Sequence, residues 1–143
     1  AHGTTFGGNP VSCAAGLANL QVLRQEGLLE HVRQEGQYAL GRLKELQAES
    51  PVVGDVRGVG LMLGVEFVKP GSKDANSEAA HRVLQRCLEH GLLMYPCGLW
   101  SQTIRLIPPL VISHEQLEEG LALFHDAVTE EPVAEAVVDR SAA

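Results

Sequence analysis

The hydrophobic spacing of this chain changes at Ser50-Pro51, and this change most limits the folds that the chain can adopt. In residues 28–48, apolar side chains recur every three or four residues, as on one face of a helix. In residues 61–67, apolar residues alternate with others, which predicts a strand with one buried face. The apolar positions are Leu29, Val32, Gly36, Ala39, Leu43 and Leu46 in the helical pattern and Leu61, Leu63, Val65 and Phe67 in the alternating one.

The remaining elements follow from similar patterns. Further helices are predicted over residues 10–25, 77–90 and from 114 onward, and further strands over 92–95 and 103–107. The order is helix, helix, one or two strands, helix, strand, strand, helix. Parallel βαβ repeats do not explain this order. It predicts an α/β fold, more closely an α+β subdomain in which a small, mostly antiparallel sheet has helices on one side.

The first predicted helix begins at Pro10, with Asn9 as its N-cap, and Gly27 marks its end. Its interior residues 13–18 are small or apolar, which would let another backbone come close. We therefore expect this helix to be buried against another element.

The last predicted helix carries the strongest start signal in the chain. Ser113 and Gln116 have the spacing of a capping box, and Ile112 and Leu117 that of a hydrophobic staple. From about Glu130 the sequence becomes small and acidic, so residues 131–143 are predicted to be a disordered tail.

The opening stretch, H-G-T-T-F-G-G-N-P at residues 2–10, has two interpretations. Glycines and threonines before a helix start can bind a phosphate through N–H groups, hydroxyls and the helix dipole. The same residues also suit a simple connecting turn, and they match no P-loop pattern. Residue types and spacing leave both interpretations open.

Two arginines lie in predicted strands. A salt bridge at a strand end is the favoured interpretation for Arg57, with a ligand contact as the alternative. Arg105 is flanked by apolar residues in a short strand, so its charge must reach solvent, a partner carboxylate or a ligand.

Composition excludes several classes of function. A net charge of −7 gives no electrostatic reason to expect a nucleic acid or an anionic membrane as partner. No apolar run is long enough to span a membrane, and no targeting segment is expected. Cys13, Cys87 and Cys97 are widely spaced and odd in number, and the six histidines are scattered, so no disulfide framework or metal site is predicted. Free thiols favour a reducing compartment such as the cytoplasm.

Several blocks in sequence order resemble the class III (omega-amino-acid) aminotransferases, which are pyridoxal-phosphate enzymes of fold type I. The blocks are HGTTFGGNP at 2–10, CAA at 13–15, GDVRGVGLMLGVE at 54–66, GLL at 91–93 and IRLIPPL at 104–110. The resemblance extends from about His2 to about Thr129. It implies that residues 1–27 end the large cofactor-binding domain and that residues 28–130 form the C-terminal small domain.

The resemblance also implies roles for single residues. In that family the second threonine of the opening motif binds the cofactor phosphate across the interface of a homodimer. This role falls on Thr5, with Thr4 and the backbone beside it in support. The arginine of the IRLIPPL block holds a substrate carboxylate in the family, which implies this role for Arg105.

The Schiff-base lysine of the family lies upstream of the opening motif and has no counterpart in this sequence. Lys44, Lys69 and Lys73 are the lysines of the chain, and none lies in a matching motif. The resemblance therefore implies a C-terminal aminotransferase fragment with no catalytic residue of its own, which is not expected to be active alone.

The segment around Met94 to Gly98 is most similar to 4-aminobutyrate aminotransferases, with 2-oxoglutarate or pyruvate as the expected acceptor. Acetylornithine, ornithine and diamine aminotransferases are alternatives within the family. A non-catalytic, stand-alone domain of the same fold is the alternative from another functional class.

Overall fold

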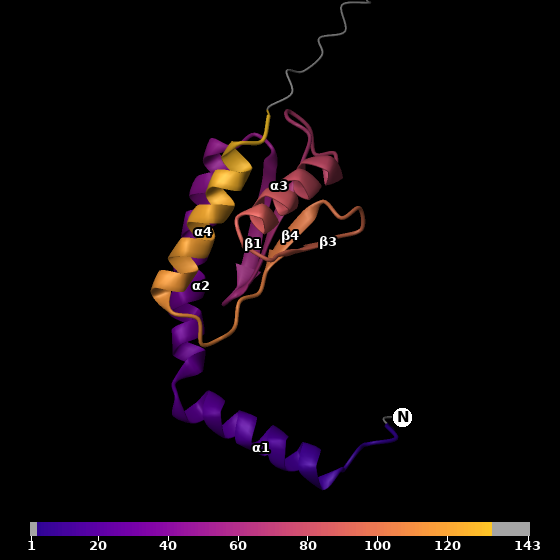
Figure 1. The fold of residues 1–143 in the computed structure, drawn as a ribbon, viewed down its shortest axis with the longest axis vertical. Helices are drawn as coiled ribbons and strands as arrows, with labels where there is room; N and C mark the ends of the chain where they lie inside the picture. Colours follow the sequence, from indigo (N-terminus) through magenta and orange to yellow (C-terminus); the bar gives the residue numbers. More distant parts are fainter. Residues whose placement is uncertain (1–2, 133–143) are drawn as a thin grey trace, which may run out of the picture.

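The structure is a computed structural model and describes residues 3–132, which form helices and a sheet in the predicted order (Figure 1). The predicted tail falls mostly on residues 133–143, which lie outside the described residues, as does His2. The elements are α1 Pro10–Gln25, α2 Leu28–Glu49, β1 Val53–Val59, β2 Met62–Phe67, α3 Ser77–Glu89, β3 Tyr95–Cys97, β4 Thr103–Leu106 and α4 His114–Thr129.

The strands form one sheet in the order β1-β2-β4-β3, and each neighbouring pair is antiparallel. The predicted antiparallel sheet is therefore confirmed. β1 and β2 are joined by a tight turn at Gly60, whose φ of 55° lies in the left-handed region that favours glycine.

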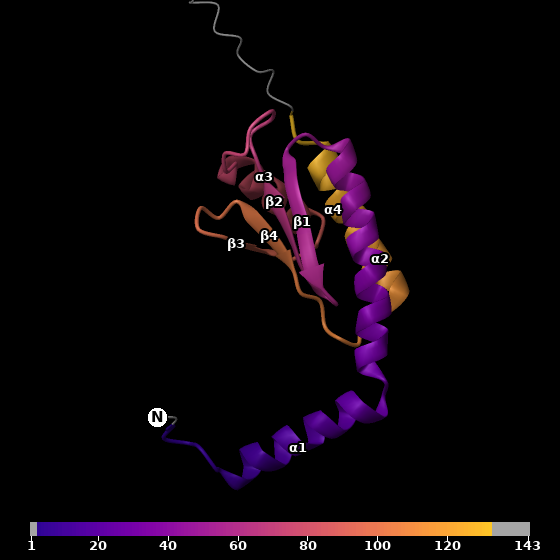
Figure 2. The same cartoon turned by 180° about the vertical axis from the view of Figure 1, so that it is seen from behind.

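Helices cover one face of this sheet. α2 contacts β1 and β2, α3 contacts β2, β3 and β4, and α4 packs on α2 and α3. In Figure 1, α3 lies in front of the sheet, and in Figure 2 the strands lie in front of α3. No helix of the described chain covers the strands in Figure 2, so the second sheet face is open.

The core lies between the covered face and the helices. The alternating pattern of residues 61–67 predicted one buried face. Its apolar residues are all at most 3% exposed: Leu61, Leu63, Val65 and Phe67. They pack in one cluster with side chains of β4 and the helices, which include Ile104, Leu43, Val83 and Phe124. Burial of these apolar side chains is the main favourable contribution to folding.

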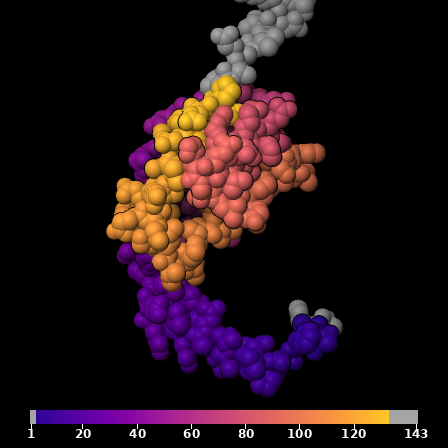
Figure 3. All heavy atoms as spheres, viewed as in Figure 1, coloured from indigo at the N-terminus to yellow at the C-terminus, as the bar shows by residue number. Residues whose placement is uncertain are grey.

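α1 forms where predicted but is not buried. Within the described chain it contacts α2, and none of its residues is buried. Figure 3 shows it extending away from the packed body. The expected burial of its small-residue interior is therefore wrong for the residues described, because no other described element packs on this helix.

Three local predictions also need correction. The buried stripe of α2 includes Leu28, whereas Leu29 is 67% exposed. The strand expected over residues 92–95 begins at Tyr95 instead, and it is an edge strand in which Pro96 is tolerated. Glu131, placed in the predicted tail, is buried, and it accepts hydrogen bonds from Arg82 and Arg86.

The start of α4 agrees with the sequence in detail. The Ser113 hydroxyl accepts from the backbone N–H of Gln116 at 3.2 Å, and the backbone N–H of Ser113 donates to the Gln116 side chain at 3.1 Å. The predicted capping box is confirmed.

Candidate functional site

The opening loop is a short exposed turn. The backbone N–H of Gly7 donates to the Thr4 carbonyl at 3.3 Å, and that of Asn9 donates to the Phe6 carbonyl at 3.2 Å. Residues 3–9 are all exposed. The loop is therefore accessible to a ligand or to another chain.

The first amides of α1 are already used. The Asn9 side-chain oxygen accepts from the backbone N–H groups of Val11 and Ser12 at 3.0 and 3.2 Å, and Pro10 has no N–H. Free helix amides, one reason for expecting a phosphate here, are thus satisfied by the cap.

The threonine hydroxyls remain as donors in this loop. Within residues 3–132, neither the Thr4 nor the Thr5 hydroxyl makes a hydrogen bond. Neutral hydroxyl and amide donors suit a phosphate, and this exposed loop provides only part of the shell that would surround one.

Arg105 lies in β4 on the open face of the sheet. Residues directly opposite one another across a sheet share a face, and Arg105 is opposite Gly64 of β2 and Tyr95 of β3. Its neighbour Ile104 points the other way and is fully buried. Arg105 is exposed, and within residues 3–132 no carboxylate lies within ion-pair distance of it.

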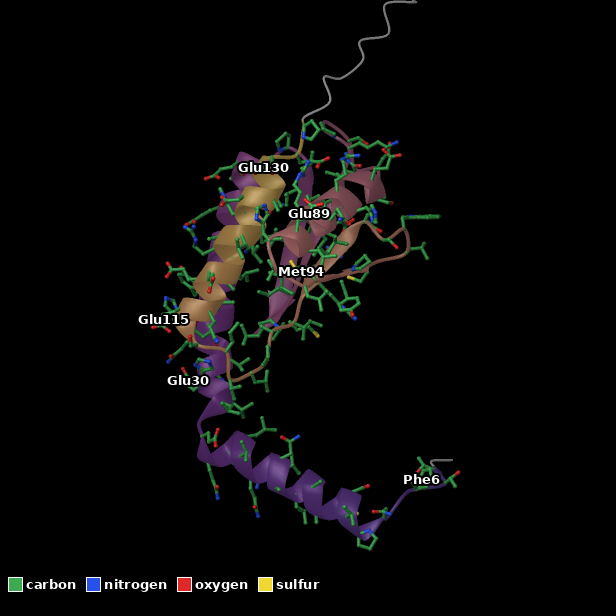
Figure 4. The ribbon with its side chains drawn as sticks, in the orientation of Figure 1. Phe6, Glu30, Glu89, Met94, Glu115 and Glu130 are labelled. Carbon is green, nitrogen blue, oxygen red and sulfur yellow. The ribbon has the colours of Figure 1, made fainter. Side chains whose placement is uncertain are left out.

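An apolar pocket adjoins this strand. Met94, Leu106, Pro108, Ile112 and Leu117 are among its lining residues, and Arg105 contributes to its wall. Figure 4 shows Met94 beside the strands and Phe6 at the far end of α1. Leu106 and Leu117 are on the helix-covered side of the sheet, so the pocket opens on that side, whereas the Arg105 side chain is on the open face. The structure does not bring Arg105 together with Thr4 or Thr5.

Arg57 forms the predicted salt bridge. Its Nη1 donates to Asp55 Oδ2 at 2.6 Å and to Glu66 Oε2 at 2.7 Å. Hydrogen bonds to these two carboxylates raise the pKa of Arg57. The part played by Glu66 was missed from the sequence, although charged residues at alternate positions of a hairpin were a usable signal.

The three lysines belong to neither the opening loop nor β4. Lys44 is on α2, and Lys69 and Lys73 are in the segment after β2; all three are exposed.

The cysteines differ widely in accessibility. Cys13 is exposed, Cys97 is intermediate and Cys87 is buried. Burial raises the pKa of the Cys87 thiol to about 11, so little thiolate is present at neutral pH. Cys87 packs in the core and is a poor candidate for a nucleophile.

Residues 3–132 contain neither a metal-binding cluster nor a membrane-spanning helix. No three His, Cys, Asp or Glu side chains gather there as metal ligands would. None of the described helices combines the length and apolar character that a membrane crossing requires.

The sequence of this chain matches one family of known proteins. The family described as aminotransferase class-III matches residues 1–128. A 4-aminobutyrate aminotransferase of Mycobacterium bovis is 43% identical over 119 residues, which cover 83% of this chain and 26% of the relative. An isoleucine 2-epimerase of Lentilactobacillus buchneri is 43% identical over 130 residues, which cover 90% of this chain and 28% of the relative.

Solved structures agree with the sequence comparisons. An aminotransferase of Bacillus anthracis has a TM-score of 0.81 and 36% identity, and the match covers 90% of this chain and 30% of that one. The chain spans between a quarter and a third of the length of these relatives. Its helices and small antiparallel sheet are those of a piece of the fold type I aminotransferase fold.

The ordered blocks of sequence, the family match over residues 1–128 and the shared fold lead to one conclusion: this chain belongs to the class III aminotransferase family.

Proposed function

We propose that this chain is the C-terminal part of a pyridoxal-phosphate-dependent aminotransferase, which transfers an amino group from an omega-amino acid to a 2-oxo acid. The observation that carries the proposal is Arg105. It lies exposed on the open face of the sheet, and no carboxylate of the described chain pairs with it.

Arg105 would bind the carboxylate of the substrate. A planar guanidinium holds a carboxylate through two parallel hydrogen bonds, which fixes both position and orientation. The amino acid and the 2-oxo acid of a transamination both carry such a group, so one arginine can serve both half-reactions.

Thr5, supported by Thr4, would bind the cofactor phosphate. The Thr5 hydroxyl is free among the described residues and the loop is exposed, which fits a site completed by a second subunit of a homodimer. When bound, pyridoxal 5′-phosphate supplies the electron sink for amino transfer. This chain would hold part of its phosphate.

The chain alone would be inactive. Amino transfer with this cofactor needs a lysine that forms a Schiff base with it. Lys44, Lys69 and Lys73 are exposed in a helix and a loop, away from the matching blocks. The lysine would come from sequence that the longer relatives have and this chain does not.

4-Aminobutyrate or a similar omega-amino acid is our candidate donor. A 4-aminobutyrate aminotransferase and a 5-aminovalerate aminotransferase of Pseudomonas putida, 43% and 34% identical to this chain, support it. An acetylornithine aminotransferase of Elizabethkingia anophelis, with a TM-score of 0.78, keeps the acetylornithine, ornithine and diamine branch as the second candidate.

The test is Arg105→Ala in the complete aminotransferase chain, with Arg33→Ala as control. Arg33 is exposed on α2 and pairs with Glu30 (labelled in Figure 4), so it has no part in the proposed site. Loss of a charged hydrogen-bonded pair costs about 2–5 kcal/mol, and we expect a large rise in KM for the carboxylate substrate with Arg105→Ala only. Unchanged KM and kcat would remove Arg105 from the site.

A further inference from the structure

Three charged side chains of the β1–β2 hairpin share the open sheet face with Arg105. Arg57 Nη1 lies 2.6 Å from Asp55 Oδ2 and 2.7 Å from Glu66 Oε2. Directly opposite pairs are Asp55 with Glu66 and Arg57 with Gly64. All three charged side chains therefore point to the face that no described helix covers.

Gly64 lies directly between the two arginines of this face, and Glu66, two residues along the same strand, is a diagonal neighbour of both. Glu66 is opposite Thr103 in β4, and Arg105 is two residues farther along that strand, opposite Gly64. Diagonal neighbours on one face are about 7–8 Å apart at Cα, within reach of long side chains. Gly64 has no side chain that could separate Glu66 and Arg57 from Arg105.

Because Glu66 pairs with Arg57, it does not form an ion pair with Arg105. Glu66 is bound to Arg57, and its side chain is 28% exposed, so it depends more on a protein partner than a fully solvated carboxylate does. Arg57 already faces two carboxylates, which makes it a poor second anchor for a substrate. If the Arg57 side chain were removed, Glu66 could instead form an ion pair with Arg105, which lies on the same face of the sheet.

We propose that Arg57 is a positioning residue that holds Glu66 away from Arg105 and so keeps the Arg105 guanidinium available to the substrate carboxylate. This inference rests on the proposed function, because it requires Arg105 to bind that carboxylate. Arg57 itself does not touch the substrate; it acts through Glu66.

The experiment compares four variants of the complete aminotransferase chain: Arg57→Met, Glu66→Gln, Arg57→Met with Glu66→Gln, and Asp55→Asn. KM and kcat are measured for the 2-oxo acid, and the dissociation constant of glutarate, a dicarboxylate that cannot react, is measured by calorimetry. Thermal unfolding of each variant reports on folding. Arg57→Gln is made in parallel, because it removes the charge while keeping an amide donor for Asp55.

Arg57→Met and Arg57→Gln should raise KM and the glutarate dissociation constant by about three- to tenfold, as expected for competition from one partly exposed carboxylate. Their kcat should stay within about twofold of the parent. Adding Glu66→Gln should restore both constants, because the competing carboxylate is then neutral. Asp55→Asn should leave KM and the glutarate dissociation constant unchanged, because the ion pair between Arg57 and Glu66 remains.

Unchanged constants in Arg57→Met would overturn the inference, as would a defect that Glu66→Gln does not relieve. A rise of equal size in Asp55→Asn would overturn it too, because it would mean general damage to the hairpin. Arg105→Ala separates this inference from the proposed function. If that variant binds glutarate normally, the proposed function fails; if it loses glutarate while Arg57→Met does not, only the positioning role fails.

Discussion

At the scale of single residues, His114 connects the start of α4 to α2. Its Nδ1 lies 2.9 Å from Glu35 Oε2, and its ring lies 4.6 Å from that of Tyr38. The hydrogen bond to Glu35 raises the pKa of His114, and the charges of Glu118 and Glu115 act in the same direction. The charged form of the imidazole is thus favoured in the folded chain.

This pair predicts a pH-dependent stability. A folded pKa above the unfolded value of about 6.5 means that the stabilisation is fully present below that value and is lost as the pH rises through the folded pKa. We therefore expect His114→Gln to reduce the free energy of unfolding more at about pH 5.5 than at about pH 8.5. Urea unfolding at both pH values measures this.

His81→Gln is the control, because His81 is exposed on α3 and has no ion pair within residues 3–132. Its effect should be small at both pH values. If His114→Gln lowered the free energy of unfolding equally at both pH values, the role assigned to the His114–Glu35 pair would be contradicted.

Single residues also show where sequence reasoning succeeds and fails. The Arg57 salt bridge was predictable because Asp55 is its near neighbour in the same strand. The burial of Glu131 was not, because its partners Arg82 and Arg86 are 49 and 45 residues away and only the fold brings them together. A pattern read along a chain does not contain such distant pairings.

At the scale of elements, α2 packs unusually closely on the β1–β2 turn. A Cβ placed on Gly36 would stand 2.4 Å from the carbonyl carbon and oxygen of Gly60 and 2.6 Å from its Cα. These are backbone atoms, so they cannot yield by a side-chain rotation. The other interior glycine of the same helix, Gly41, has nothing within 4 Å of its Cβ position.

The two glycines therefore predict opposite effects of one substitution. Gly36→Ala should destabilise the chain by about 1–3 kcal/mol, because the helix and the turn must move apart. Gly41→Ala should stabilise it by about 0.5–1 kcal/mol through helix propensity. Urea unfolding measures both, and changes of the same sign would contradict the packing described.

The elements differ in how well the sequence predicts them. The start of α4 was predictable to the residue because its capping box is a local interaction among four neighbouring residues. β3 was placed wrongly because Tyr95–Cys97 is a strand through its pairing with β4 at the sheet edge, whereas the apolar residues before it have no strand partner. An edge strand depends on its neighbour more than on its own composition.

At the scale of the whole molecule, two surfaces are left open. α1 exposes Leu17, Leu20 and Val22, and the uncovered side of the sheet exposes Met62 and Tyr95. The chain matches only 26–30% of the length of its relatives, so a complete aminotransferase has much additional sequence that could cover these surfaces.

We propose that this chain contributes Arg105 to the substrate site and Thr5 to the cofactor phosphate site of an aminotransferase whose Schiff-base lysine lies in other sequence. The most direct measurement incubates the 143-residue chain with pyridoxal 5′-phosphate, reduces it with borohydride and maps pyridoxyl-lysine by mass spectrometry. The same treatment of the urea-unfolded chain gives the nonspecific background. The complete aminotransferase chain serves as the positive control.

We predict no enrichment above background at Lys44, Lys69 or Lys73 in this chain, and one stoichiometric adduct on a lysine outside it in the complete chain. A stoichiometric adduct on one of these three lysines that is lost on unfolding would contradict the claim, because the chain would then hold a lysine site of its own.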